Sequence, residues 1–210
     1  MTVNFKSVTK ADTHIILLVD RSGSMCSCRQ SAEEGINSLI NEQKAVEGEC
    51  KVTIIEFDDK YEVACSRKNI LDVKSVTVNP RGSTALYDAI CNTILTYKDV
   101  RKDNERTIFV ITTDGHENSS REHRKEDVKR MIEEMEEKHN WKFVYTGANQ
   151  DAIAVGGELG IKPMSCSSFE GAKYAQMSGR VSSALTNHRG MSDVKYNSSV
   201  KSGEFFKDGN

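Results

Sequence analysis

Two short runs of the sequence are apolar throughout, and they limit the possible fold more than any other feature. Residues 15–19 read IILLV and lead into Asp20, while residues 108–112 read IFVIT and lead into Thr113 and Asp114. A strand without a polar face must be covered on both sides, as the central strands of a parallel sheet are. We therefore expect both runs to be central strands of such a sheet.

Stretches with helical spacing separate the strand-like runs. Val128, Met131, Ile132 and Met135 stand at i, i+3, i+4 and i+7, which places them on one face of a helix. Alternating strands and helices predict a three-layer α/β/α sandwich with a mainly parallel central sheet, a Rossmann-like arrangement. The DDK segment at 58–60 separates two strand-like runs and predicts a hairpin, so one antiparallel strand is expected at the edge of the sheet.

The chain is expected to form one domain with short additions at both ends. Its 210 residues, 37% hydrophobic and 29% charged, are ordinary for one globular domain. We expect an N-terminal extension at 1–12, the domain at 13–189 and a polar, flexible tail at 190–210, where apolar residues become sparse. Within the domain, Ser119-x-x-Glu122 fits the capping-box pattern and predicts the start of a helix.

Charge and cysteine content exclude several classes of partner. The 29 basic and 31 acidic residues give a net charge of −2, so neither nucleic acid nor an anionic membrane is an expected partner. The N-terminal residues lack the apolar region of a signal peptide. The six cysteines lack paired CxxC motifs, which favours reduced, buried thiols in a cytoplasmic protein. Cys26 and Cys28 leave a zinc or redox role open, although a second ligand pair is missing.

Oxygen-bearing side chains follow both apolar runs and a third, glycine-containing turn, NPRGST. In an open parallel sheet, functional residues gather at the carboxyl ends of the strands, so we expect these side chains to meet. Hydroxyl and carboxylate oxygens suit a hard cation, Mg²⁺ or Mn²⁺, better than zinc. The open side of that metal would favour an anionic oxygen, such as an Asp or Glu of a partner protein. The five site residues are Asp20, Ser22, Ser24, Thr84 and Asp114.

Three segments carry a resemblance to a known family. DRSGSM at 20–25, GST at 82–84 and TTDG at 112–115 resemble the metal-ion-dependent adhesion site (MIDAS) of the von Willebrand factor A (VWA) domain. The family pattern is Asp-x-Ser-x-Ser, a distant Thr and an Asp after a central strand, in that order. One departure is the turn PRGST, which has one glycine where many relatives have two.

The resemblance implies a role for each of the five site residues. Ser22, Ser24 and Thr84 would be metal ligands, while Asp20 and Asp114 would hold the ion directly or through water. The segment GANQDAIAVGGELG is similar to a region of small stand-alone members, which implies a solitary intracellular protein. Four neighbouring residues are candidate contacts to the partner, although a solvated loop is the alternative for the last two: Arg21, Ser83, His116 and Glu117.

An enzyme is the main alternative to a binding module. Phosphatases and phosphotransferases of the haloacid dehalogenase type also place an Asp after their first strand, which would be Asp20. That chemistry needs a second carboxylate two residues later, and Ser22 stands there. A serine hydrolase needs Gly-x-Ser-x-Gly or a partnered histidine, and neither is evident. The sequence therefore favours a non-enzymatic, metal-dependent protein-binding module, and it leaves the oligomeric state open.

Overall fold

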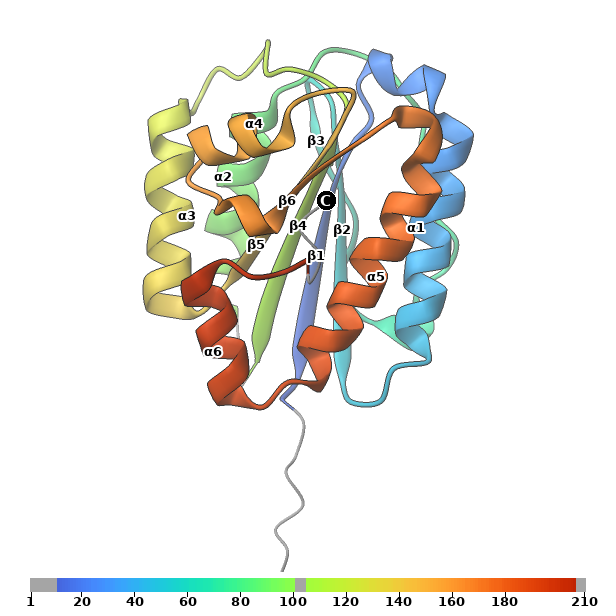
Figure 1. Cartoon of the computed structure of the whole chain (residues 1–210). Coiled ribbons are helices and arrows are strands. Elements are labelled where there is room, and N and C mark those ends of the chain that lie inside the picture. The colour runs from blue at the N-terminus through green and yellow to red at the C-terminus, as the bar shows by residue number, and fades with distance from the viewer. Residues whose placement is uncertain (1–10, 101–104, 207–210) are drawn as a thin grey trace, which may run out of the picture.

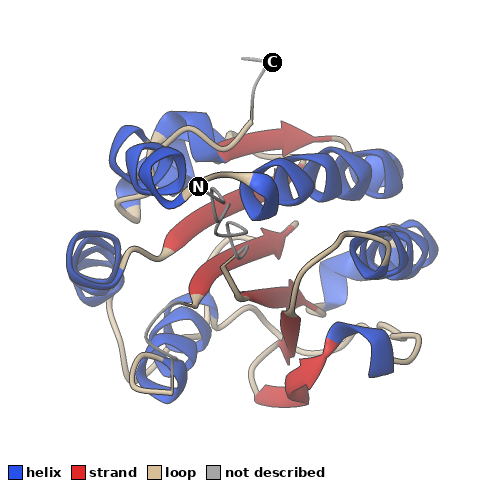
Figure 2. Cartoon of the chain, turned by 90° about the horizontal axis from the view of Figure 1, so that it is seen from below, coloured by secondary structure: helices blue, strands red, loops and turns tan. Residues whose placement is uncertain are grey.

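The computed structural model describes residues 11–100 and 105–206, and it consists of a central sheet between two layers of helices (Figures 1 and 2). The N-terminal extension expected at 1–12 lies almost wholly outside the described residues. The strands are β1 (Thr13–Asp20), β2 (Cys50–Phe57), β3 (Tyr61–Asn69), β4 (Arg106–Thr113), β5 (Lys142–Ala148) and β6 (Cys166–Phe169). The helices are α1 (Arg29–Lys44), α2 (Leu86–Tyr97), α3 (Lys125–His139), α4 (Ala152–Glu158), α5 (Tyr174–Gly190) and α6 (Asp193–Ser202).

The sheet has the topology that the sequence predicts. Within the described residues the strand order is β3-β2-β1-β4-β5-β6, and the two fully apolar runs lie side by side at its centre as β1 and β4. All neighbouring pairs are parallel except β2 and β3, which form the predicted hairpin. The predicted three-layer sandwich with one antiparallel edge strand is therefore confirmed.

Successive residues of the central strands contribute to two separate cores. Ile15 and Leu17 of β1 pack in the core beneath α1, α5 and α6, whereas Ile16 and Leu18 pack in the core beneath α2, α3 and α4. Because side chains alternate between the faces of a strand, a run buried on both faces must be apolar at every position. This requirement explains the sequence IILLV.

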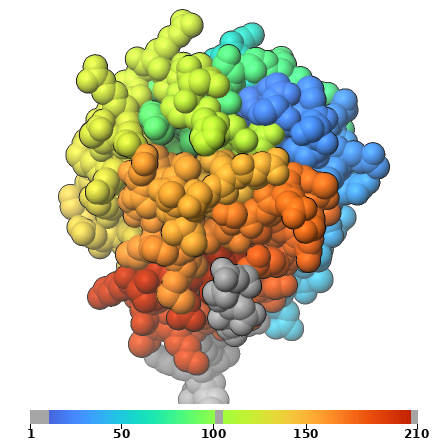
Figure 3. Space-filling model, turned by 45° about the horizontal axis from the view of Figure 1, so that its top comes forward, coloured from blue at the N-terminus to red at the C-terminus, as the bar shows by residue number. Residues whose placement is uncertain are grey.

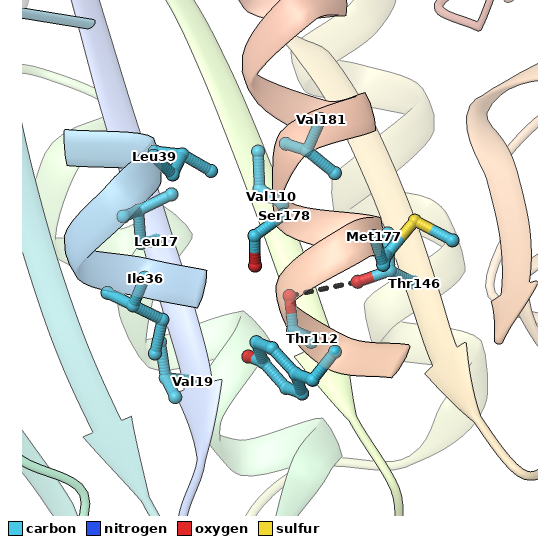
Figure 4. A pocket seen from close by; sticks show the side chains of 11 residues that line it. Leu17, Val19, Ile36, Leu39, Val110, Thr112, Thr146, Met177, Ser178 and Val181 are labelled. Atoms are coloured by element: carbon cyan, nitrogen blue, oxygen red, sulfur yellow. Dashed lines mark hydrogen bonds between the residues drawn. The ribbon is translucent and has the colours of Figure 1, made fainter. Parts of the chain in front are cut away.

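Helices α1 and α5 pack closely, and a small cavity remains between them and the sheet (Figure 4). A β-carbon on Gly35 would stand 2.6 Å from Ser178 Oγ, so only glycine permits this approach. The cavity has a volume of about 20 Å³, and Thr112 and Thr146 share a 2.9 Å hydrogen bond at its wall. It has room for about one water molecule and is too small for a ligand.

The flexible tail expected at 190–210 is folded in the part that the structure describes, residues 190–206. Helix α6 occupies ten of these residues, and Tyr196 and Phe205 are buried against the body of the protein. The Tyr196 hydroxyl donates to the backbone oxygen of Thr107 at the amino end of β4. The prediction overlooked the helix because its apolar residues are few. Two of them, Tyr196 and Val200, are nevertheless buried, whereas Val194 is exposed. Helix α6 lies at the end of the sheet opposite the loops that follow β1 and β4 (Figure 1).

None of the helices in the described ranges is long and apolar enough to cross a membrane. All six cysteines lie in these ranges and none forms a disulfide. Four of them are buried and only Cys26 is exposed, broadly as the sequence suggested.

Candidate functional site

Three loops meet at the carboxyl edge of the sheet. The segment after β1 adjoins the segment after β4 on this face, where blue and yellow-green surfaces touch in Figure 3. The first loop continues into a short 3₁₀ helix, Gly23–Ser27, whose Met25 is fully buried and anchors the loop in the core. Backbone bonds tie it to the turn before α2, since the Gly23 N–H donates to the Gly82 oxygen at 3.1 Å.

Asp20 forms the floor of the site. It is fully buried, and each of its carboxylate oxygens accepts a hydrogen bond. Oδ1 accepts from the Ser22 backbone N–H at 2.6 Å, and Oδ2 accepts from Thr113 Oγ1 at 2.5 Å. Burial raises the pKa of Asp20, while the bond from Thr113 and the bonds from Ser22 oppose that rise. Both oxygens of this carboxylate are thus fixed in place by neighbours.

The oxygens of three site residues surround a single point beside Gly115. A β-carbon at Gly115 would stand 2.8 Å from Thr84 Oγ1 and 3.5 Å from both Asp20 Oδ2 and Ser22 Oγ. All three residues are buried. Only a glycine leaves this position free, because any side chain would fill the space between the oxygens. The three residues come from separate segments of the chain, so the fold itself brings them together.

Ser24 and Asp114 form the rim above this floor. Ser22 Oγ lies 3.0 Å from Ser24 Oγ, and Ser24 Oγ donates to Asp114 Oδ1 at 2.6 Å. Ser24 is exposed and Asp114 is half-buried, and burial raises the pKa of Asp114. The structure thus brings all five site residues together, two carboxylates and three hydroxyls, with one side open to solvent. This set of oxygen donors fits a hard dication.

Arg21 is buried, whereas a contact with a partner requires an exposed side chain. Only 4% of the residue is exposed, and its guanidinium turns into the protein. Nε donates to Asp58 Oδ2 at 2.9 Å, and Nη1 donates to Glu56 Oε2 at 3.2 Å and to Glu62 Oε2 at 2.8 Å. The Arg21 carbonyl also accepts from the Arg81 N–H at 2.8 Å. The prediction of a partner contact at Arg21 is therefore wrong, because three carboxylates hold the side chain inside.

The other candidate contacts divide into two kinds. Ser83 and His116 are exposed at the edge of the site, and their contact with a partner stays a prediction. Glu117 is half-buried and its carboxylate bonds backbone N–H groups of the same chain, including that of Tyr87 at 3.0 Å. It also accepts from the N–H groups of Ser119 and Ser120 in its own loop, so it joins this loop to the start of α2, and its contact with a partner stays a prediction.

Thr113 orients Asp20 through its hydrogen bond, although the sequence did not single it out as a site residue. The doubled threonine of TTDG was the available signal. In the part of the chain that the structure describes, no group of three or more His, Cys, Asp or Glu side chains is placed to hold a metal. The zinc role considered for Cys26 and Cys28 therefore gains no support.

The fold and the site define a class: a Rossmann-like α/β domain with an oxygen-lined cluster at the carboxyl edge of its sheet. Residues 15–117 match the sequence model of the von Willebrand factor type A domain. The matched stretch contains all five site residues. Over that stretch, just under half of the chain, the sequence is similar to a von Willebrand factor type A domain. No curated protein sequence matches the chain closely enough to count as a relative.

Solved structures with the same fold share little sequence with this chain. Proximal thread matrix protein 1 from the mussel byssus superposes with a TM-score of 0.67 at 15% identity, over 86% of this chain and 48% of that one. The vWF domain of the type V pili tip protein Mfa5 from Porphyromonas gingivalis gives 0.60 at 8% identity, over 89% and 99%. Manganese-loaded TRAP protein of Plasmodium vivax gives 0.54 at 15% identity, over 81% and 73%. The chain spans about half the length of the first solved chains that it resembles.

Proposed function

We propose that the five site residues hold Mg²⁺ or Mn²⁺ in a MIDAS and that the metal binds a carboxylate of a partner protein. The observation that carries this proposal is the convergence of Thr84, Asp20 and Ser22 oxygens around the vacant β-carbon position of Gly115. Ser22, Ser24 and Thr84 would supply hydroxyl oxygens, and Asp20 and Asp114 would supply carboxylate oxygens. Mg²⁺ and Mn²⁺ prefer such ligands.

The open side of the site supports a role in binding rather than catalysis. A bound dication would supply an electrophilic centre for an oxygen of Asp or Glu. Ser24, Ser83 and His116 are exposed around that side and would line the contact with the partner. A solved protein with this fold is described as manganese-loaded, which favours a hard dication here as well. Domains of this family are typically protein-interaction modules without enzymatic activity, and the haloacid dehalogenase alternative gains no support.

A cytoplasmic location is part of the same proposal. The six cysteines are unpaired, which favours a reducing compartment. The net charge of −2 argues against nucleic acid and anionic membranes as partners.

Metal binding is tested by thermal unfolding and titration calorimetry with Mg²⁺ and Mn²⁺. With the ion at about a hundred times its dissociation constant, wild-type protein should gain about 2.7 kcal/mol of unfolding free energy. Thr84→Ala and Asp114→Ala should lose that gain, whereas Ser83→Ala, an exposed neighbour outside the ligand set, should keep it. An equal ion-dependent gain in wild type and in both ligand variants would place the ion elsewhere and reject the site.

A capture experiment then tests whether a partner protein binds through the metal. Immobilised protein is exposed to native lysate in Mg²⁺, and bound proteins are eluted with EDTA. Asp20→Ala serves as the control. A partner that is released by EDTA, fails to bind Asp20→Ala and is lost when one of its own acidic residues is replaced would support the proposal. Binding that is indifferent to EDTA would contradict it.

A further inference from the structure

Helix α2 begins without a side chain of its own to bond its first backbone N–H groups. Its N-cap residue is Ala85, whose methyl group accepts no hydrogen bond. Instead, Glu117 Oε2 accepts from the Tyr87 N–H at 3.0 Å, and Ser120 Oγ accepts from the Asp88 N–H at 3.1 Å. The unpaired donors of a helix start need such partners. Here the partners come from the loop that follows β4.

Helix α2 bonds the same loop in return. The Asp88 carboxylate accepts from the backbone N–H groups of three successive loop residues, Arg121 at 2.7 Å, Glu122 at 3.1 Å and His123 at 2.7 Å. Side chains of each segment thus satisfy the backbone of the other. We call this arrangement the α2 clasp, made of residues 84–88 and 117–123.

Asn118 is the point at which the α2 clasp reaches the metal site. Its Oδ1 accepts from the Thr84 backbone N–H at 2.9 Å, and its own N–H donates to the Thr84 carbonyl at 3.0 Å. One residue therefore bonds both backbone polar groups of Thr84. The Thr84 hydroxyl lies 2.8 Å from the vacant β-carbon position of Gly115, three residues before Asn118 in the chain. Asn118 thus fixes the spacing between the loops that carry Thr84 and Asp114.

We propose that Asn118 is a positioning residue of the metal site, an inference that rests on the proposed function. Without the Asn118 side chain, the Thr84 N–H would bond water instead. The Thr84 hydroxyl would then sample positions away from the other ligands. The α2 clasp holds that hydroxyl in place before a metal arrives, so binding does not bear the cost of ordering the loop. Asn118 is itself exposed, so its replacement leaves both cores intact.

The chain contains a matched control for this role. Asn37 also bonds both backbone polar groups of one loop residue, here with its side chain alone: Oδ1 accepts from the Val76 N–H and Nδ2 donates to the Val76 carbonyl, both at 2.8 Å. Val76 lies outside the metal site. Asn118→Ala removes one side-chain bond to a loop backbone, whereas Asn37→Ala removes two to Val76 and one to the Glu33 carbonyl. Asn37→Ala is therefore a stringent control, because it loses more bonds and leaves the site residues untouched.

The test compares wild type, Asn118→Ala, Asn118→Asp and Asn37→Ala. Mn²⁺ affinity is measured by electron paramagnetic resonance, and amide exchange at Thr84 is measured by NMR in metal-free protein. Asn118→Ala should bind Mn²⁺ about tenfold more weakly and exchange faster at the Thr84 amide. Asn118→Asp keeps an oxygen acceptor at the same place and should restore both. Asn37→Ala should lower the melting temperature without changing Mn²⁺ affinity.

Three other outcomes would overturn the inference. Wild-type affinity in Asn118→Ala would leave the α2 clasp a purely structural feature. An equal loss of affinity in Asn37→Ala would assign the effect to general destabilisation. Failure of the wild-type protein to bind Mn²⁺ would reject the proposed function and this inference with it, a result distinct from the first two because it appears before any substitution is made.

Discussion

At the scale of single residues, polar side chains in and beside the site have two different roles. Some oxygens line the open site, whereas neighbouring charged groups turn inward and hold the loops. Arg21 stands between two site residues in the sequence, yet its guanidinium bonds Asp58, which is completely buried and also accepts from Arg81 Nε at 2.8 Å. The charge of Asp58 therefore balances arginines on two of the loops that form the site.

Replacement of Asp58 tests this balance. Asp58→Asn keeps the size of the side chain but removes the charge, which deprives the buried Arg21 of its one fully buried counter-ion among the three carboxylates that bond it. We expect a loss of about 3 kcal/mol of unfolding free energy in urea titrations. Glu62→Gln is the control, since Glu62 is half exposed and bonds the same arginines. Its loss should stay below about 1 kcal/mol, and equal losses in the two variants would contradict the account.

At the scale of secondary structure, elements with a continuous local pattern were predictable and elements held by distant partners were not. The runs IILLV and IFVIT predicted the two central strands because their burial on both faces demands apolar residues throughout. The capping box at Ser119 was wrong, since α3 begins only at Lys125. Asp88 of α2 takes up the loop N–H groups before α3 begins, and no local pattern reveals that contact.

In the C-terminal segment, by contrast, local helix signals were present but the helix was not predicted. Helix α6 has the start and end signals of a helix: Ser192 accepts from the Lys195 N–H, and Gly203 ends it with φ +81°. Its sparse apolar residues outweighed these signals in the sequence reasoning. Its stability comes instead from contacts with the rest of the fold, such as the bond from Lys142 Nζ to the Ser199 carbonyl at 3.0 Å.

The docking of β5 against α6 predicts a pH dependence. Burial lowers the pKa of Lys142 to about 7, and Lys162 adds to the effect, whereas Glu136, Glu204 and Cys166 oppose it. An unfolded lysine titrates near pH 10.4, so between about pH 7 and about pH 10 the unfolded chain binds a proton that the folded protein does not. Over that window, Lys142 makes folding more favourable as pH rises, and its stabilising share is lost as pH falls.

Lys142→Met isolates this effect, because the other titrating groups are common to both proteins. We expect the variant's stability relative to wild type to be greatest at about pH 6 and to decline by about 2 kcal/mol by about pH 9. Urea unfolding at the two pH values gives the difference directly. A difference that does not change with pH would show that Lys142 stays charged in the folded state.

At the scale of the whole molecule, chain order and sheet topology together create the candidate site. The sequence supplied the order of the three oxygen-bearing segments, and the parallel sheet brings their ends to one edge. Which side chains of these loops are buried was not predictable, because their burial depends on bonds to residues elsewhere in the chain. Arg21 was predicted at the surface and is buried, while Thr84 is buried by contacts that the local sequence does not contain.

The most direct measurement is a crystal structure of the protein grown with Mn²⁺, with anomalous data collected at the manganese edge. We expect one strong peak at about 2.1 Å from the hydroxyl oxygens of Ser22, Ser24 and Thr84, with its remaining side facing solvent or a carboxylate. An anomalous map without a peak among these oxygens, or with Mn²⁺ bound at another place on the protein, would contradict it.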